Sequence, residues 1–88
     1  MICKRCIVSG RVQGVWYRDT TRRKALELEL SGSAVNLPDG TVEVIACGEP
    51  QAVAALCDWL WEGSPLSQVT EVRCVDWTGE PSADFTIG

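Results

Sequence analysis

The chain contains no histidine, and this absence excludes several common chemistries. Zinc sites with histidine ligands, Ser-His-Asp hydrolysis and a Cys-His nucleophile pair are all ruled out. No apolar run approaches the roughly 20 residues that a membrane-spanning helix requires. The first ten residues place Lys4 and Arg5 among the apolar ones and lack the apolar segment of a signal peptide. We therefore expect a cytoplasmic protein that does not enter a membrane.

The overall composition is that of one small globular unit. With 88 residues and 9.6 kDa there is room for one hydrophobic core, so we predict a single domain over residues 1–88. Hydrophobic residues make up 45% of the chain and charged residues 23%, a balance that argues against disorder. The net charge of −4 would repel a phosphate backbone, so we expect no nucleic-acid partner.

The basic residues are concentrated at one end of the sequence. Seven of the eight lysines and arginines lie in the first 24 positions, together with a single acid, Asp19. The remainder of the chain contains only Arg73 against 11 acids. Such an asymmetry can attract a small anion to one end of an acidic protein. A basic helix face that merely keeps the protein soluble is the alternative interpretation.

The five cysteines include one pair, Cys3 and Cys6, with the spacing of a metal-binding motif. The pair lies in a segment that has the pattern of a strand. Because strand side chains alternate between faces, the two cysteines point to opposite sides and cannot readily share a metal ion. We expect no metal site and predict that Cys6, Cys57 and Cys74 are buried or half-buried thiols. The odd number also argues against the disulfide framework of a secreted protein.

Hydrophobic periodicity and turn residues predict two helices among several strands. The Pro-Asp-Gly turn within residues 37–40 predicts a hairpin. The expected strands cover residues 2–9, 35–36, 41–47, 69–75 and 83–87, and the expected helices cover residues 19–29 and the segment from Pro50 to Gly63. The order βαββαβ, with a small extra strand, predicts an α+β ferredoxin-like sandwich: one antiparallel sheet with two helices on one face.

A glycine-bounded loop, Gly10 to Gly14, joins the first strand to the first helix. Glycines permit unusual backbone angles, so several N–H groups can converge on one point, and the helix start adds unpaired N–H groups. The Arg18 guanidinium could donate two hydrogen bonds to the oxygens of a phosphate bound there. Taken alone, such a loop is usually a plain turn, an arginine at a helix start is usually solvated, and a residue like Asn36 is usually part of a turn or bulge.

Two long motifs resemble those of the acylphosphatase family. Residues 10–18 read Gly-Arg-Val-Gln-Gly-Val-Trp-Tyr-Arg, and residues 32–44 contain Asn36 and the Pro-Asp-Gly turn. Further similarity continues to residues 84–87, so the resemblance covers essentially the whole chain. It implies a small ferredoxin-like enzyme that hydrolyses the carboxyl–phosphate bond of acyl phosphates. The products are a carboxylate and inorganic phosphate, with no metal or cofactor and no partner other than these small molecules.

The resemblance also implies the site residues. The Arg18 guanidinium and a set of backbone amides would hold the phosphoryl group, and the side-chain amide of Asn36 would position the attacking water. The amides would be those of Arg11, Val12, Gln13, Gly14 and Val15. The leaving carboxylate is a weak base, and phosphoryl transfer depends mainly on positioning and charge stabilisation. The missing histidine is therefore no obstacle to this reaction. Separately, we expect the enzyme to act as a monomer.

The chain departs from the family pattern at three positions. Glu29 stands where many relatives have the glycine that closes the first helix. A left-handed residue there would cost a non-glycine about 1 kcal/mol, so we expect the helix to end differently. Ser33 replaces a usual aromatic residue and Val35 a usually basic one. Both are close to Asn36, so we expect them to affect affinity and rate more than the reaction.

Cys3 and Cys47 form a candidate disulfide. In the ferredoxin-like fold the first and third strands are antiparallel neighbours, so the start of one meets the end of the other, and some bacterial relatives have a disulfide at similar positions. The closed loop of about 45 residues would stabilise the fold by roughly 4 kcal/mol on the chain-entropy model. Two free thiols in a reducing compartment are at least as compatible with the sequence.

Three other functions compete with the enzyme. A binding module that holds phosphate without turnover would need the loop and Arg18 but not the amide of Asn36. An acylphosphatase-like domain of a carbamoyl-transfer protein in hydrogenase maturation would be joined to a much longer chain. RNA binding on the open sheet face lacks the aromatic motif that it requires. We assign Trp16 and Tyr17 to packing, and the other tryptophans to core or half-buried positions without a functional role.

Overall fold

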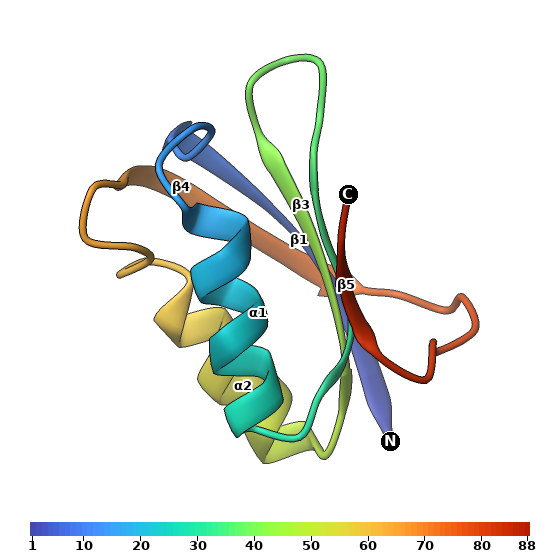
Figure 1. Cartoon of the computed structure of the whole chain (residues 1–88). Coiled ribbons are helices and arrows are strands. Elements are labelled where there is room, and N and C mark those ends of the chain that lie inside the picture. The colour runs from blue at the N-terminus through green and yellow to red at the C-terminus, as the bar shows by residue number, and fades with distance from the viewer.

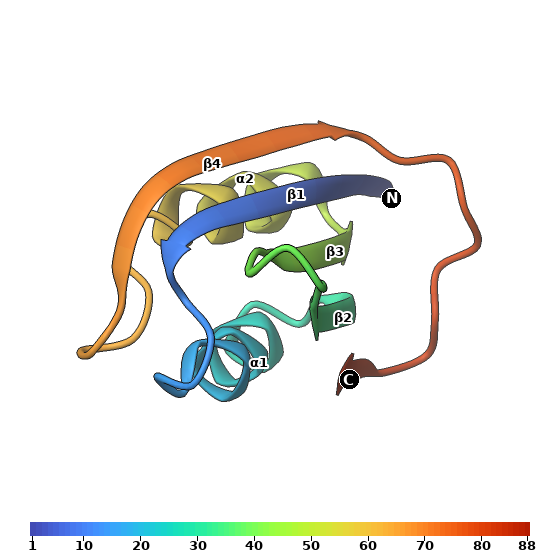
Figure 2. The same cartoon turned by 90° about the horizontal axis from the view of Figure 1, so that it is seen from above.

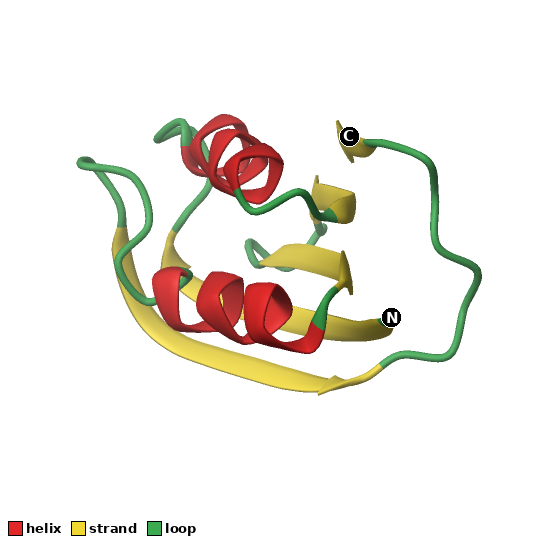
Figure 3. Ribbon diagram, turned by 90° about the horizontal axis from the view of Figure 1, so that it is seen from below, coloured by secondary structure: helices red, strands yellow, loops and turns green.

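The computed structural model describes all 88 residues, which form five strands and two helices. In chain order these are β1 (Ile2–Arg11), α1 (Tyr17–Glu27), β2 (Ser31–Asn36), β3 (Val42–Gly48), α2 (Pro50–Trp59), β4 (Gln68–Asp76) and β5 (Phe85–Ile87). The strands form one open sheet in the order β4-β1-β3-β2-β5, and both helices pack on the same face of it (Figures 1 and 3). This arrangement confirms the predicted α+β ferredoxin-like fold. Neither α1 nor α2 is long and apolar enough to cross a bilayer.

The sheet is antiparallel except at one edge. β1 pairs antiparallel with β3 and with β4, and β3 pairs antiparallel with β2. β5, however, runs parallel to β2, so the expectation of a wholly antiparallel sheet is wrong at this edge. The reason is the route of residues 77–84, which pass around the sheet from β4 at one edge to β5 at the other (Figure 2). Because of this route, β5 enters the sheet beside β2 and runs in the same direction as β2.

Three strands are longer than predicted: β4 gains one residue at each end, and β1 and β2 are extended because close backbone pairing overrides weak strand propensity. β1 continues through Gly10 and Arg11, which still pair with β4 after a register shift at Ser9/Gly10. β2 begins at Ser31 rather than at residue 35, and it contains Gly32 at φ 139°. A Cβ atom at Gly32 would lie 1.8 Å from the carbonyl oxygen of Ile45, so only glycine allows β3 to approach this closely.

The helix-facing side of the sheet and the inner faces of both helices enclose one core cluster of 15 buried residues. β1 and β3 contribute alternate residues, as a half-buried strand should. In the predicted stripe of α1, Thr21 and Ala25 are buried, and in that of α2 the apolar residues Val53, Leu56 and Leu60 are buried. The cluster contains Cys6, Val8, Val12, Val15, Tyr17, Ala25, Leu30, Ala34, Val42, Val44, Ala46, Val53, Leu56, Leu60 and Phe85.

Helix α1 occupies residues 17–27 rather than 19–29, and it ends with a left-handed residue at Glu29. The Leu30 N–H donates to the carbonyl of Ala25 at 2.9 Å, and the Glu29 N–H donates to the carbonyl of Leu26 at 3.1 Å. This is the Schellman pattern, which normally has glycine at the left-handed position. The expectation of a different helix end is therefore wrong. Burial of Leu30 against the core fixes the turn, and Glu29 adopts φ 58° within it.

Four of the five cysteines are joined in two disulfides. Cys3 bonds to Cys47 between β1 and β3, and Cys6 bonds to Cys74 between β1 and β4. The prediction of three thiols at Cys6, Cys57 and Cys74 is wrong for two of them, because the register places Cys6 directly opposite Cys74. Only Cys57 is free. Its sulfur lies 3.6 Å from that of Cys6, and burial raises the pKa of the Cys57 thiol.

Candidate active site

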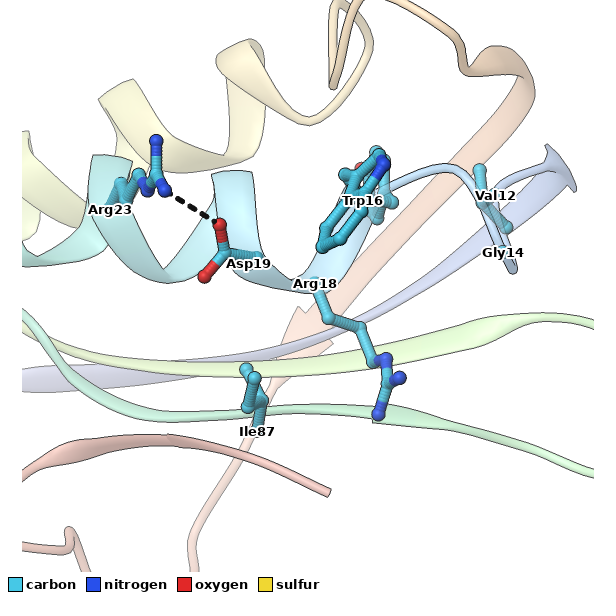
Figure 4. A pocket seen from close by; sticks show the side chains of 8 residues that line it. Val12, Gly14, Trp16, Arg18, Asp19, Arg23 and Ile87 are labelled. Carbon is cyan, nitrogen blue, oxygen red and sulfur yellow. Dashed lines mark ion pairs between the residues drawn. The ribbon is translucent and has the colours of Figure 1, made fainter.

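A pocket of about 560 Å³ opens at the N-terminal end of α1 (Figure 4). Its walls come from the loop after β1, from the first turns of α1 and from β5, and its volume lies within the usual range of small-molecule sites. The lining residues are Val12, Gly14, Trp16, Tyr17, Arg18, Asp19, Arg23 and Ile87. The cluster of Cys6, Cys57 and Cys74, whose sulfurs lie within 4.8 Å of one another, contributes none of these residues.

The loop that enters the pocket contains two left-handed residues, Gly14 at φ 73° and Trp16 at φ 65°. Left-handed steps turn neighbouring N–H groups toward a common side and create a concave surface for an anion. A Cβ atom at Gly14 would meet no atom within 4 Å, so the loop faces open space there. The N-cap of α1, Trp16, provides no side-chain acceptor, which leaves the first N–H groups of the helix free for a ligand.

The side chain of Gln13 ties this loop to the turn between β2 and β3. Its Nε2 group donates to the carbonyl oxygens of Leu37 and Thr41, both at 2.9 Å. The Nε2 group of Gln13 is thus engaged within the protein, and its backbone N–H can face a ligand. Sequence reasoning missed this contact, because glutamine in a glycine-rich loop gives no signal of which carbonyls it will reach.

Two further side chains fix the other end of the loop. The Ser64 hydroxyl donates to the carbonyl of Val15 at 2.7 Å, and both residues are buried. The Tyr17 hydroxyl donates to the carbonyl of Leu60 at 2.8 Å. Burial raises the pKa of Tyr17, so the phenol remains a neutral donor. The loop is therefore held by hydrogen bonds at both ends, partly buried at Gln13 and buried at Val15, which keeps its N–H groups in one arrangement.

Arg18 lies in the first turn of α1, and its side chain extends from the helix toward the ribbon of β2 (Figure 4). Its Nη1 atom donates to the carbonyl oxygen of Gly88, whose N–H in turn donates to the carbonyl of Ala34 in β2. No aspartate or glutamate forms an ion pair with Arg18, whereas the neighbouring Arg23 pairs with Asp19 at 3.2 Å. The Arg18 guanidinium therefore remains able to bind an anion in the pocket.

Asn36 is the last residue of β2, next to Leu37, to which the Gln13 side chain is bonded. Its Oδ1 atom is buried and has no hydrogen-bond partner. Buried carbonyl oxygens are nearly always paired, so an unpaired one calls for a specific explanation, such as a ligand or an ordered water. The following turn is rigid, because the Thr41 N–H and hydroxyl both donate to Asp39 and lower the pKa of that carboxyl.

The structure brings some of the predicted site residues together and leaves others outside the pocket. Val12, Gly14 and Arg18 line the pocket. The remaining predicted residues, Arg11, Gln13, Val15 and Asn36, are not among its lining residues, and Gln13 is hydrogen-bonded to Leu37, the residue after Asn36. Tyr17 is buried as expected, but the assignment of Trp16 to packing is wrong, because 73% of that residue is exposed.

Comparison with known proteins places this fold and this loop in one family. The family model described as Acylphosphatase matches residues 4–87. An acylphosphatase of Chromohalobacter salexigens is 48% identical over 86 residues, which are 98% of this chain and 96% of that relative.

Solved structures give the same result. An acylphosphatase from Bacillus subtilis superposes with a TM-score of 0.95 at 35% identity, covering 100% of this chain and 99% of that one. An acylphosphatase from Coxiella burnetii superposes with a TM-score of 0.94 at 42% identity, covering 99% of this chain and 92% of that one. These matches confirm the resemblance drawn from the motifs: the chain belongs to the acylphosphatase family.

Proposed function

We propose that the protein hydrolyses small-molecule acyl phosphates to a carboxylate and inorganic phosphate at the pocket beside Arg18. The phosphoryl group lies in the concave loop, where the backbone N–H groups of residues 11–15 donate to its oxygens. Arg18 exchanges its hydrogen bond with the Gly88 backbone oxygen for a charge-assisted, bidentate bond to phosphate. Family membership and the open surface at Gly14 support this placement.

The reaction requires one bond to form and one to break at phosphorus. The water oxygen attacks phosphorus while the bond from phosphorus to the acyl oxygen breaks, and its electron pair leaves with the carboxylate. One proton of the water moves to a phosphoryl oxygen and the other stays on the attacking oxygen, so the products are a carboxylate and dihydrogen phosphate, and the charge of the substrate dianion is divided between two monoanions. Fixed N–H dipoles and the guanidinium stabilise the equatorial oxygens in the transition state. None of these steps requires a metal ion.

The observation that carries the mechanism is the unpaired Oδ1 atom of Asn36. Leaving a buried carbonyl oxygen unpaired costs about 1–3 kcal/mol. That cost is recovered when the attacking water donates a hydrogen bond to Oδ1, which also directs a lone pair of the water toward phosphorus. An anion-binding module without turnover would gain nothing from such an acceptor, so Asn36 distinguishes the enzyme from the binding module.

Substitution of the two side chains separates binding from turnover. Arg18→Ala should abolish both hydrolysis of benzoyl phosphate and competitive inhibition by inorganic phosphate. Asn36→Ala should lower kcat by roughly 10²- to 10³-fold, the usual effect of removing one transition-state hydrogen bond, while phosphate still binds. All assays contain EDTA, and activity that depends on added metal would contradict the proposal.

The controls for these two variants replace an exposed arginine and an exposed carboxamide residue outside the pocket. Arg73→Ala removes an arginine from β4, and Gln51→Ala removes a carboxamide from α2; both should leave kcat and phosphate inhibition unchanged. Normal turnover by Asn36→Ala would refute the water-positioning role and favour a different acceptor. A monomeric state and a cytoplasmic location are part of the same proposal and can be tested by sedimentation and by fractionation.

A further inference from the structure

Trp16 holds a large apolar side chain open to solvent beside the proposed phosphate site. Four of the pocket's lining residues are apolar, but Val12 and Tyr17 are almost completely buried. Trp16 is 73% exposed and Ile87 is 45% exposed. The apolar surface that the pocket can offer to a ligand therefore comes from these two side chains.

Nothing within the fold accounts for the position of the Trp16 indole. The side chain makes no hydrogen bond, and the stacked aromatic pair of the structure joins Tyr17 to Trp59. The backbone, by contrast, is firmly held: the Thr20 N–H and hydroxyl donate to the Trp16 carbonyl at 3.0 and 2.8 Å. Trp16 adopts a left-handed conformation that residues other than glycine rarely take. The chain thus holds the backbone of an exposed aromatic residue at the pocket, where Arg18 also lies (Figure 4).

We propose that Trp16, together with Ile87, binds the acyl group of the substrate and makes the enzyme selective for aromatic acyl phosphates. This inference rests on the proposed function, because it assigns the part of the pocket that the phosphoryl group leaves free. A planar aryl ring can stack on the indole while the phosphate remains with the loop and Arg18, and a small acyl group such as acetyl cannot reach this surface to the same extent.

The charges around the pocket favour a neutral acyl group over one that carries a second anion. Arg23, at the far side of the lining, is already neutralised by its ion pair with Asp19. The Arg22 Nε atom donates to the carbonyl of Phe85 at 3.1 Å. Arg23 is thus paired and Arg22 is not among the lining residues, whereas the indole of Trp16 and Ile87 present apolar surface in the pocket.

The test compares benzoyl phosphate with acetyl phosphate as substrates of the wild-type chain and of Trp16→Ala. Loss of one aromatic contact should lower the ratio of kcat/KM for benzoyl over acetyl phosphate by about 2- to 12-fold, mainly through KM. Trp16→Phe should restore most of the ratio. Trp61→Ala removes another half-exposed tryptophan, outside the pocket, and should leave the ratio unchanged.

Binding of phosphonates, which the enzyme cannot hydrolyse, tests the role of Trp16 independently of turnover. Phenylphosphonate should bind the wild-type chain more tightly than methylphosphonate, and Trp16→Ala should weaken binding of phenylphosphonate selectively, by calorimetry. If the wild type hydrolyses neither acyl phosphate, the proposed function is wrong, and the phosphonates still decide whether Trp16 binds the aryl ring. An unchanged substrate ratio, equal loss for both phosphonates, or a preference for acyl phosphates with a second carboxylate would overturn the inference.

Discussion

The left-handed residue at the end of α1 allows a stability change to be worked out from the structure. Glu29 has φ 58°, and its side chain is exposed and forms neither an ion pair nor a hydrogen bond. Replacing it by glycine therefore removes no contact, while the two backbone hydrogen bonds of the Schellman turn remain. The change acts only on the backbone conformation of this one residue.

The expected gain for Glu29→Gly is the difference between two conformational effects. A non-glycine residue in the left-handed region costs roughly 1–2 kcal/mol. Glycine also increases the entropy of the unfolded chain, which offsets about 0.4–1 kcal/mol of that gain. The net stabilisation should be about 1 kcal/mol, equivalent to an increase in Tm of about 4–8 °C for a domain of this size. Urea denaturation and calorimetry measure both quantities.

Glu27→Gly is the matched control, because Glu27 is also exposed but is the last helical residue of α1 and has no positive φ. There glycine should destabilise the helix by about 1 kcal/mol, so the same replacement two residues apart should have opposite signs. If Glu29→Gly destabilised the protein, or if both variants lost stability equally, the assignment of backbone strain to position 29 would be refuted.

Two other predictions concern buried groups. Ser64→Ala leaves the Val15 carbonyl buried without its donor and should lower the free energy of unfolding by about 1–3 kcal/mol. Because that hydrogen bond fixes the end of the loop, the affinity for phosphate should fall as well. A loss of stability with unaltered phosphate affinity would show that the bond does not shape the site. Burial raises the folded-state pKa of Cys57 above 9.0, so the stability linked to this thiol is complete below the unfolded-state pKa and is lost as pH rises through the folded value. Cys57→Ala should therefore flatten the fall in unfolding free energy above about pH 9, and an equally steep fall in the variant would assign that loss to other groups.

The elements with strong periodicity could be predicted from the sequence, and the others depend on partners far along the chain. Residues 31–34, Ser-Gly-Ser-Ala, have little strand propensity, and they become the first half of β2 only because β3 lies beside them. β5 has three residues, too few for a pattern, and its parallel direction follows from the path of residues 77–84. The Cys6–Cys74 bond joins positions 68 residues apart and follows from the β1–β4 register alone.

The candidate site also contains features that the sequence predicts and features that only the fold creates. That the glycine loop and Arg18 lie at one pocket could be predicted, because these residues are close together in the chain. The contacts that hold the loop could not, since Gln13 reaches Thr41 and Ser64 reaches Val15 across the fold. Trp16 was misassigned because a tryptophan beside apolar residues is usually buried, whereas in the structure this residue has a left-handed backbone and is 73% exposed.

The contacts around the loop explain why the proposed site can function without histidine. The groups that hold the loop in place are a carboxamide, a hydroxyl and a phenol whose pKa burial raises, and all three are neutral at physiological pH. In the proposed mechanism the phosphoryl group meets peptide dipoles and a guanidinium that is always protonated, and the water meets a second carboxamide. No protein group has to gain or lose a proton during the cycle. A histidine in this pocket would introduce a charge that varies near neutral pH, whereas the present set keeps the electrostatic field at phosphorus constant.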